Sequence, residues 1–295
     1  MLEFKKQFIE KYSKLTNFNE YSSAIEKFIR KSIRTNTLKI SVKALKSKLN
    51  ENFILDEIPW SKESFYIKEK TGRRDIGNRP EHKQGLFFVQ SSASLLPSII
   101  LAPKPHEILL DMAASPGAKT THLASLMQNT GIIIANDLPK RLSQLLFNLR
   151  RLGVVNTIVT SGNALDLKGS YDKILLDAPC SASGIIYGQT ENTIRTLKEW
   201  NPATIKRLSN LQKKLLLHAF DLLKPNGDLV YSTCSLEPEE DEEVIKYLLN
   251  KKSNAELIPI DKEKLKIKAD SNYGIKIWPH YNETEGFFIS KIKKL

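Results

Sequence analysis

The chain has 295 residues, of which 41% are hydrophobic and 26% are charged, so it can bury a large core like an ordinary globular protein. It contains no apolar run of about 20 residues that could span a bilayer and no apolar stretch typical of a signal peptide. We therefore expect a cytoplasmic protein with no membrane partner. The net charge of +12 favours a polyanionic partner, most commonly nucleic acid, although a lysine-rich genome alone could produce it.

The first hundred residues predict a small α+β module. They hold 19 Lys and Arg against 11 Asp and Glu, so much of the positive charge lies here. Helix-spaced apolar side chains predict helices over 3–14 and 20–33, and Ser41 is suited to cap a third helix. The helix that Ser41 caps is predicted over 42–49. The other predicted elements are strands over 34–40, 53–60, 64–68 and 87–89, a basic loop over 71–80, and a helix over 91–101.

A proline-flanked segment near 103–106 separates this module from a more regular pattern, so we predict one domain over 1–102 and a second over 103–295. In the second domain, apolar strands alternate with helices, which predicts a mostly parallel, doubly wound sheet. The strands are predicted over 108–112, 131–136, 157–159, 173–176 and 228–231, with helices over 120–128, 140–152 and 205–223. Three further strands, over 254–260, 274–278 and 287–291, predict an antiparallel finish.

The segment Leu110–His122, LDMAASPGAKTTH, joins the first strand of this sheet to its first helix. Such turns lie at the carboxyl edge of the sheet, where ligands bind. The segment matches neither GxGxxG nor GxxxxGK[ST]. Its small residues let the backbone approach a ligand closely, which suits an adenosyl group with an amino-acid tail. Asp137 ends the next strand, and we favour a contact with ribose hydroxyls over a helix cap.

Cys180 and Cys234 are the only cysteines. Neither lies in a CxxC pair, so we predict no metal site, and a cytosolic protein is not expected to use them as a structural disulfide. Both follow strand ends, Cys180 just after Asp177, so all three side chains should converge on the cofactor crevice. Two thiols, a carboxylate and an adenosyl cofactor suit methylation of a pyrimidine at carbon 5. A thiolate adds to carbon 6, carbon 5 then attacks an electrophilic methyl group, and the acid contacts the ring nitrogen.

Several motifs together resemble one enzyme family. They are DMAASPGAKTTHLA, ANDLPKR, DAPCSASG, YSTCS, and WPH followed by GFF, and they resemble the RNA cytosine-5 methyltransferases of the Nol/Nop/Sun (Fmu) family over roughly residues 30–295. The short chain looks most like the archaeal tRNA members. The resemblance implies a Rossmann-like fold, S-adenosylmethionine as the cofactor, and RNA, most of all tRNA, as the substrate.

The resemblance also implies roles for individual residues. Cys234 would be the nucleophile and Cys180 would assist product release, while Asp177 would contact the cytosine ring and Lys119 would line the site. Asn163 stands where the family usually has Asp, and its amide oxygen can still accept from the adenine amino group. The residues implied for the cofactor are Ala113, Ala114, Ser115, Pro116, Gly117, Ala118, Lys119, Asp137, Arg141, Asn163 and Asp177.

The basic front module is the predicted RNA-binding surface, because clustered cations give sequence-independent affinity for phosphates. The acidic run Glu237–Glu243 is predicted to open a helix at Pro238, with its carboxylates complementing the helix dipole. The predicted RNA contacts are Lys27, Arg30, Lys31, Arg34, Lys70, Arg73, Arg74 and Arg79.

Three alternatives stay open at this stage. The substrate could be ribosomal RNA, or the chain could be a catalytically silent RNA-binding assembly factor, although such a factor would need neither cysteine. An amino-group methyltransferase is disfavoured because Asp177-Ala178-Pro179-Cys180 lacks the Pro-Pro-aromatic sequence that those enzymes need. We expect a monomer, and the sequence does not indicate whether a helper protein is required.

Overall fold

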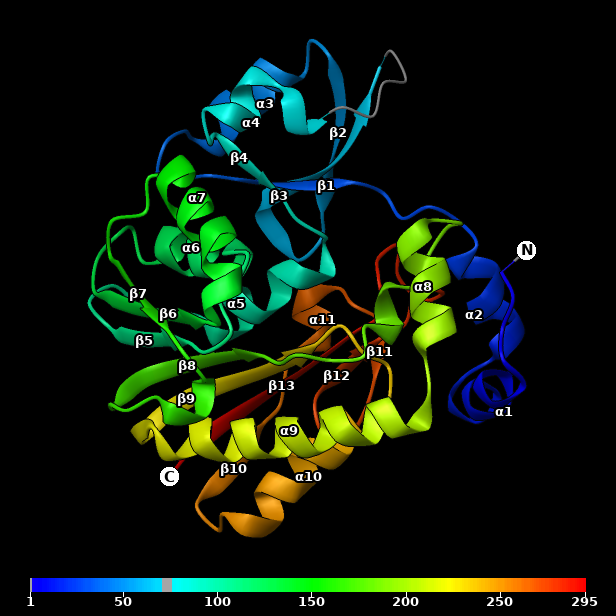
Figure 1. Cartoon of the computed structure of the whole chain (residues 1–295). Coiled ribbons are helices and arrows are strands. Elements are labelled where there is room, and N and C mark those ends of the chain that lie inside the picture. The colour runs from blue at the N-terminus through cyan, green and yellow to red at the C-terminus, as the bar shows by residue number, and fades with distance from the viewer. Residues whose placement is uncertain (1, 71–75) are drawn as a thin grey trace.

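A computed structural model describes residues 2–70 and 76–295. Within these residues the chain forms a four-stranded antiparallel sheet and a larger mixed sheet with helices on both faces (Figure 1). In the same ranges no helix is both long and apolar enough to cross a membrane. The small sheet lies above the large one in Figure 1, and the two N-terminal helices lie beside the large sheet, on the right of the view.

The N-terminal part contains short helices and the small sheet. Its order is β2-β3-β1-β4, and all three pairings are antiparallel. The Ser41 hydroxyl caps α3 by accepting from Ala44 N at 3.2 Å, as the sequence predicts. The elements are α1 (Lys6–Leu15), α2 (Phe18–Ile25), β1 (Ser32–Thr35), α3 (Val42–Leu49), β2 (Phe53–Ile58), β3 (Ser61–Glu69), α4 (Pro80–Lys83), β4 (Phe87–Val89) and α5 (Leu96–Leu101).

The rest of the chain forms the large sheet and its covering helices. The first half comprises β5 (Ile108–Asp111), α6 (Ala118–Leu126), β6 (Ile132–Asp137), α7 (Leu142–Leu152), β7 (Thr157–Ser161) and β8 (Tyr171–Asp177). The second half comprises α8 (Glu191–Glu199), α9 (Pro202–Asp221), β9 (Leu223–Thr233), α10 (Glu242–Lys251), β10 (Ala255–Ile258), α11 (Lys262–Leu265), β11 (Ala269–Asp270), β12 (Ile275–Ile277) and β13 (Phe287–Lys294).

The large sheet is doubly wound, as the sequence predicts. Its order is β11-β12-β13-β9-β8-β5-β6-β7, and β10 pairs with β13. The strands from β9 to β7 run parallel, whereas β13 runs antiparallel to β9 and begins the antiparallel finish. The chain winds outward from β5 through β6 to β7 and then returns to β8 on the other side of β5. This reversal between β5 and β8 marks the place where such sheets bind ligands.

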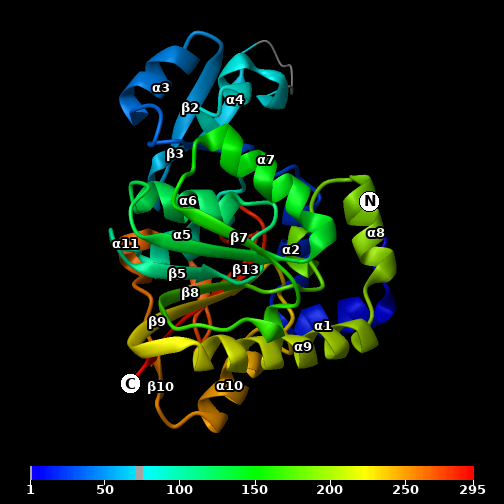
Figure 2. The same ribbon diagram turned by 60° about the vertical axis from the view of Figure 1, so that its left-hand side comes forward.

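Neighbouring residues of each strand face opposite sides, so each strand supplies two cores. Leu109 and Leu175 belong to the core beneath α5 and α6. Leu110 and Leu176 belong to the core beneath α9 and α10. Figure 2 shows these two helix pairs on opposite faces of the sheet. Because the strands are covered on both faces, they read as continuous apolar runs in the sequence.

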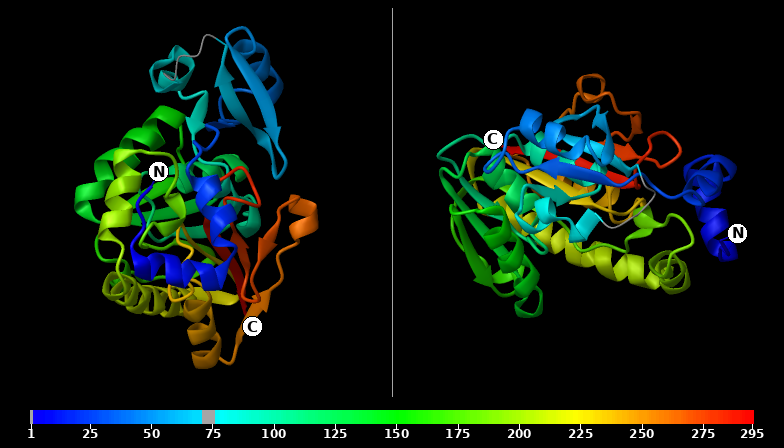
Figure 3. Two further views of the ribbon diagram at one scale, coloured as in Figure 1. Left: turned by 90° about the vertical axis from the view of Figure 1, so that its right-hand side faces the viewer. Right: turned by 90° about the horizontal axis from the view of Figure 1, so that it is seen from above.

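Helices α1 and α2 pack against the large domain rather than on the small sheet. Tyr12 and Tyr21 share a buried apolar cluster with Trp200 and Trp278, which lie more than 170 residues later in the chain. Figure 3 shows α1 and α2 beside α8 and away from the small sheet. Helix α5 packs on β8 and β9. Segments before residue 103 thus contact the large sheet. The division into domains over 1–102 and 103–295 stays a prediction.

Some boundaries differ from those predicted. The helix predicted over 20–33 ends at Ile25, whose carbonyl accepts from Gly188 N at 2.6 Å. The following residues instead supply β1, which pairs with both β3 and β4. Helix α8 is not among the predicted elements. Thr190 caps it, with its hydroxyl accepting from Thr193 N at 3.1 Å, and this local signal is visible in the sequence.

The prediction that Arg34 contacts RNA is wrong. Its side chain is only 1% exposed, and its guanidinium donates to Gln90 Oε1 at 2.6 Å, to the carbonyl of Ala118 at 2.7 Å and to Thr121 Oγ1 at 2.7 Å. Burial lowers the pKa of Arg34 to about 9. Arg34 therefore connects β1 of the small sheet to the first turn of α6. The predicted contacts Arg73 and Arg74 lie outside the described residues.

We predict that Arg34→Met lowers the free energy of unfolding by about 3 kcal/mol, because three buried acceptors lose a charged donor. Urea unfolding followed by circular dichroism measures the change. The matched control is Arg30→Met, which removes an exposed arginine with surface ion pairs and should change stability by less than about 0.5 kcal/mol. Equal effects of the two substitutions would contradict this role for Arg34.

Candidate functional site

The candidate site lies where three neighbouring strands of the large sheet end. Strand β5 ends at Asp111, β8 at Asp177 and β9 at Thr233. Strand β8 pairs in parallel with both β5 and β9, so the loops after all three emerge at the same edge. This edge includes the reversal of winding between β5 and β8.

The turn after β5 is shaped by Gly117 and held by Asp137. Gly117 has a φ of +98° and directly precedes α6. A Cβ at this position would lie 3.1 Å from Leu145 Cδ1, so both backbone conformation and space favour glycine. The Asp137 carboxylate accepts from Ser115 N at 2.8 Å and from Leu138 N at 2.8 Å. Asp137 therefore fixes the turn rather than capping the following helix.

A cavity of about 320 Å³ opens beside this turn, which is within the usual size range of small-molecule sites. The predicted residues that line it are Ala113, Ser115, Asp137, Arg141, Asn163, Asp177, Cys180 and Cys234. The other predicted residues lie in or next to the same turn but do not line this cavity: Ala114, Pro116, Gly117, Ala118 and Lys119. The structure thus brings the predicted residues together, while their roles toward a cofactor stay predictions.

Asn163 and Arg141 each have an additional structural contact in this region. The Asn163 amide oxygen accepts from Leu165 N at 3.1 Å, so a predicted contact with adenine would use its second lone pair. The guanidinium of Arg141 donates to the carbonyl of Ser115 at 2.9 Å. Its Nε lies 3.5 Å from Asp137 Oδ1. Arg141 therefore helps to hold the turn and the acidic side chain together.

Lys119 and Asp177 form an ion pair at the edge of the cavity. Lys119 Nζ lies 2.6 Å from Asp177 Oδ2 and donates to Ser94 Oγ at 3.1 Å. Ser232 Oγ donates to the other oxygen of Asp177 at 2.7 Å. Burial alone would lower the pKa of Lys119, but the attraction of Asp177 outweighs burial and raises it. The ammonium thus stays charged and holds the carboxylate at the end of β8.

The two thiols lie next to each other. Cys180 Sγ and Cys234 Sγ are 3.0 Å apart, well beyond the length of a disulfide bond, and both cysteines are free. The hydrogen bond with Cys234 raises the pKa of Cys180 well above its ordinary value, and burial adds to this effect. Cys180 therefore keeps its proton at neutral pH and can donate it in a hydrogen bond to the sulfur of Cys234.

Glu240 joins the two loops that carry these thiols. Its carboxylate accepts from Ser181 N at 3.0 Å, from Ser181 Oγ at 2.5 Å and from Ser235 Oγ at 2.6 Å. Ser181 directly follows Cys180, and Ser235 directly follows Cys234. One buried carboxylate therefore fixes both cysteine loops.

Two glycines let a third loop pack against the same place. Gly184 N donates to the carbonyl of Cys234 at 2.9 Å, and Gly286 N donates to the carbonyl of Gly184 at 2.8 Å. A Cβ on Gly184 would lie 2.2 Å from the oxygen of Gly286. The backbones of three segments thus lie in direct contact behind Cys234.

The acidic run was predicted to open a helix at Pro238, and this is wrong. Helix α10 begins at Glu242, and three of the acids before it are buried. Glu237 accepts from Tyr12 Oη at 2.8 Å and from Trp200 Nε1 at 2.7 Å. Asp241 accepts from Thr233 Oγ1 at 2.6 Å. Sequence reasoning missed these acids and Glu240 because a cluster of carboxylates normally indicates a solvated surface.

The doubly wound sheet, the cavity at its switch point and the adjacent side chains define the class of Rossmann-like methyltransferases. The sequence profile of the 16S rRNA methyltransferases RsmB/F matches residues 98–293. A second profile, for the N-terminal domain of 16S rRNA methyltransferase RsmF, matches residues 4–92. The chain belongs to the RsmB/F family, which is the Nol/Nop/Sun family of the predicted resemblance.

Curated relatives include enzymes for two kinds of RNA. The chain is 41% identical to the tRNA (cytosine(49)-C(5))-methyltransferase of Pyrococcus abyssi, over 99% of this chain and 98% of that protein. It is 34% identical to ribosomal RNA small subunit methyltransferase F of Psychromonas ingrahamii, over 93% of this chain and 59% of that protein. It is 38% identical to the 25S rRNA (cytosine-C(5))-methyltransferase nop2 of Schizosaccharomyces pombe, over 90% of this chain and 46% of that protein.

Solved structures share the whole architecture. A methyltransferase homologue from Pyrococcus horikoshii is 36% identical, with a TM-score of 0.83 over 99% of this chain and 100% of that one. NSun6 from Pyrococcus horikoshii with SFG is 25% identical, with a TM-score of 0.87 over 99% of this chain and 98% of that one. These similarities confirm the predicted fold class and the predicted family.

We predict that Glu240→Gln slows methyl transfer at least about tenfold, because an amide nitrogen replaces one acceptor oxygen and the cysteine loops shift. The rate per folded molecule is measured with a labelled methyl donor, and iodoacetamide labelling of Cys180 should become faster. Glu237→Gln is the matched control, since Glu237 is equally buried but binds Tyr12 and Trp200. A Glu237→Gln variant that loses as much activity as Glu240→Gln would contradict this assignment.

Proposed function

We propose that this protein methylates carbon 5 of cytosine in RNA, with S-adenosylmethionine as methyl donor and tRNA as substrate. The observation that carries the proposal is the pair of free thiols, 3.0 Å apart, beside a cavity that also contains Asp177. Family membership and the relatives that act on cytosine support it. Carbon 5 of cytosine is a poor nucleophile, and addition of a thiolate to carbon 6 activates it.

The cavity has the donor set that an adenosyl group requires. Asp137 offers carboxylate oxygens for ribose hydroxyls, and Asn163 offers an amide for adenine. The small side chains of the turn after β5 leave the backbone accessible for the amino-acid part. When bound, S-adenosylmethionine supplies an electrophilic methyl group.

The proposed chemistry assigns different tasks to the two cysteines. Cys234 Sγ forms the bond to carbon 6, while the protonated Cys180 donates a hydrogen bond that stabilises the Cys234 thiolate. Asp177 accepts a hydrogen bond from the amino group of the cytosine ring, and the Lys119 ammonium paired with it stabilises the negative charge that develops on the ring. After methylation a solvent water takes the proton from carbon 5, the electron pair of that C–H bond forms the carbon 5–carbon 6 double bond, and the carbon 6–sulfur bond breaks with its electron pair returning to Cys234 Sγ. Cys180 assists this release.

The choice of tRNA is based on the extent of similarity. The archaeal tRNA enzyme matches this chain over 98% of its own length, whereas the two rRNA enzymes extend well beyond their matched 59% and 46%. Ribosomal RNA is the second candidate because the family descriptions name it. A catalytically silent assembly factor would have no use for the adjacent thiols. One chain supplies both cysteines, so we propose a monomer as the working unit. We also propose that the protein acts in the cytoplasm.

The experiment that tests the function is incubation of the protein with labelled S-adenosylmethionine and either total tRNA or total rRNA, followed by mapping of 5-methylcytosine. Label in tRNA at one cytosine position supports the proposal. Label in rRNA alone would replace tRNA by the second candidate. No label in either RNA would contradict the proposed activity.

We predict that Cys234→Ala abolishes methyl transfer and that Cys180→Ala accumulates a covalent protein–RNA adduct, because the nucleophile is then retained and release is impaired. The adduct is measured as a slow band on a denaturing gel. The double variant is the control and should give no slow band. An adduct that forms without Cys234 and requires Cys180 would reverse the two roles.

The proposed RNA surface includes exposed cations of the N-terminal part. Of the predicted contacts, Lys27, Arg30, Lys31 and Lys70 are exposed, and Arg79 is half-buried. The target cytosine has to leave its stack to reach Cys234, so a flipped or single-stranded base is required. Phosphates along the strand would then contact the basic surface.

We predict that RNA affinity falls about tenfold or more between 50 and 200 mM salt, because each phosphate contact releases a condensed counterion. Filter binding with the Cys234→Ala protein measures the dissociation constant without turnover. Uncharged detergent or glycerol at matched osmolarity serves as the control and should have little effect. A dissociation constant that does not change with salt would rule out this surface.

A further inference from the structure

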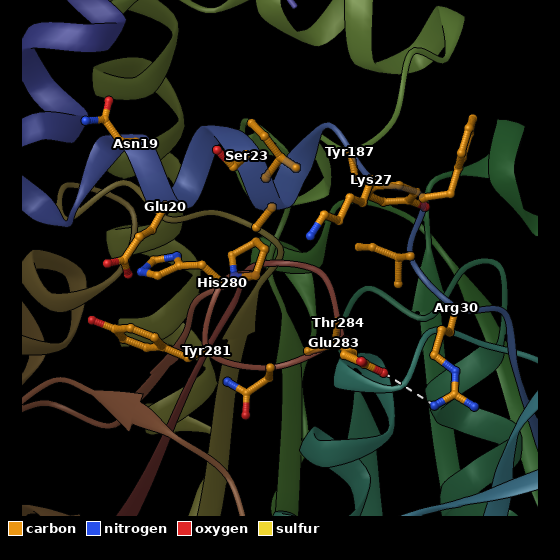
Figure 4. Close-up of a pocket in the computed structure, with 16 residues that line it drawn as sticks. Asn19, Glu20, Ser23, Lys27, Arg30, Tyr187, His280, Tyr281, Glu283 and Thr284 are labelled. Carbon is orange, nitrogen blue, oxygen red and sulfur yellow. Dashed lines mark hydrogen bonds and ion pairs between the residues drawn. The ribbon is translucent and has the colours of Figure 1, made fainter.

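A second pocket lies beside the cysteine site, between α2 and the loop 279–284. It has a volume of about 730 Å³, and Figure 4 shows the side chains around it. At one end His280 and Tyr281 lie next to Glu20, and at the other end Lys27 and Arg30 lie near Tyr187. The pocket thus has His280 and Tyr281 at one end, where Lys268 Nζ lies 5.0 Å from the Tyr281 ring centroid, and Lys27 and Arg30 with Tyr187 at the other.

The backbone places this pocket close to Cys234. Gly184 N donates to the carbonyl of Cys234, and Gly286 N donates to the carbonyl of Gly184. The pocket residue Tyr187 is three residues from Gly184, and Thr284 is two residues from Gly286. Since each residue spans at most about 3.6 Å, both pocket residues lie within about 11 Å of glycines that are bonded next to Cys234. The pocket is therefore close enough to Cys234 in the chain for a neighbouring nucleotide of a bound RNA strand to reach it.

The aromatic end is suited to a nucleobase. The ring centroids of His280 and Tyr281 are 4.2 Å apart, and both side chains are half-buried, so part of each ring remains exposed. His280 Nε2 is bonded to Thr16 Oγ1 at 3.0 Å, which holds the imidazole in place. Unpaired bases bind single-strand sites by stacking on such rings. The neighbouring Glu20 carboxylate can accept from a base amino group.

The cationic end is suited to a phosphate. Lys27 and Arg30 are exposed, and Arg30 forms ion pairs with Asp56 and Glu283 at the surface. Such exposed pairs contribute little stability, so a phosphate can compete with the carboxylates for the guanidinium. Glu20, which lies at the aromatic end, disfavours a phosphate there. The charges therefore orient a nucleotide with its base toward Tyr281.

We propose that this pocket binds the nucleotide next to the target cytosine, with its base stacked at His280 and Tyr281 and its phosphate at Lys27 and Arg30. The inference rests on the proposed function, because it requires an RNA strand at Cys234. It gives the enzyme a second contact with the unpaired strand. The target is then selected by the separation of two neighbouring bases as well as by the cytosine itself.

The test is a cycle that combines Tyr281→Leu with an abasic nucleotide in the RNA. The RNA is a transcript containing the mapped cytosine, with an abasic site on its 5′ or its 3′ side. In the wild-type protein, one of the two abasic sites should raise KM about tenfold, the effect expected for loss of one stacked base. In Tyr281→Leu, KM for intact RNA should rise by a similar factor, and the abasic site should add less than twofold. The leucine keeps apolar bulk, and kcat should change by less than twofold.

Lys27→Gln provides a second variant that leaves the aromatic end intact. It should raise KM several-fold at low salt and reduce the slope of log affinity against log salt by about one. Lys246→Gln, on the exposed side of α10, is the charge-matched control and should change neither value.

Two results would overturn the inference. If each abasic site raises KM by the same factor in Tyr281→Leu as in the wild-type protein, the two effects are independent. The pocket then binds something other than a neighbouring nucleotide. If wild-type protein methylates neither tRNA nor rRNA, the proposed function and the pocket assignment fail together. If the wild-type protein methylates RNA but the effects of Tyr281→Leu and the abasic site are independent, only the pocket assignment fails and the proposed function stands.

Discussion

The structure of the site depends on one buried carboxylate. Glu240 receives hydrogen bonds from the residues that follow both cysteines, and burial raises the pKa of this group. A carboxylate without these donors would be costly in such a place. Ser181 and Ser235 follow two different strands, so their hydrogen bonds to Glu240 tie the ends of β8 and β9 into one unit, and Gln212 Nε2 of α9 donates a further hydrogen bond at 3.2 Å. This connection and the pairing of β8 with β9 together place the two Sγ atoms 3.0 Å apart.

The same principle extends to the N-terminal segments. Glu237 is fully buried and is paired with Lys11 at 2.6 Å, so α1 helps to neutralise an acid three residues before Glu240. Arg34 attaches the small sheet to the first turn of α6 through three hydrogen bonds. Buried charged groups thus join these three parts of the chain in addition to the apolar clusters that they share. The small sheet and the turn after β5 are held in one arrangement by these interactions.

The sequence predicts the sheet well because its strands are covered on both faces and read as apolar runs. It also predicts that Asp177, Cys180 and Cys234 meet, because the carboxyl ends of parallel strands share one edge. It does not reveal Glu240 or the burial of Arg34. A charged residue in a sequence normally indicates solvent exposure, and only the three-dimensional fold shows that distant donors and acceptors surround it. The second pocket is invisible for the same reason, since its walls come from segments about 250 residues apart.

The contact between Gly184 and Gly286 sets a limit on how this protein can vary. A methyl group on Gly184 would lie 2.2 Å from the oxygen of Gly286, and one on Gly286 would lie 2.9 Å from the Cα of Gly184. Real Cβ atoms do not approach backbone so closely, so even alanine would force the loops apart. Because Gly184 is bonded to the carbonyl of Cys234, that separation would reach the cysteine directly. Neither position can therefore accept a side chain without a shift of the backbone, and the location of Cys234 depends on the absence of these two side chains.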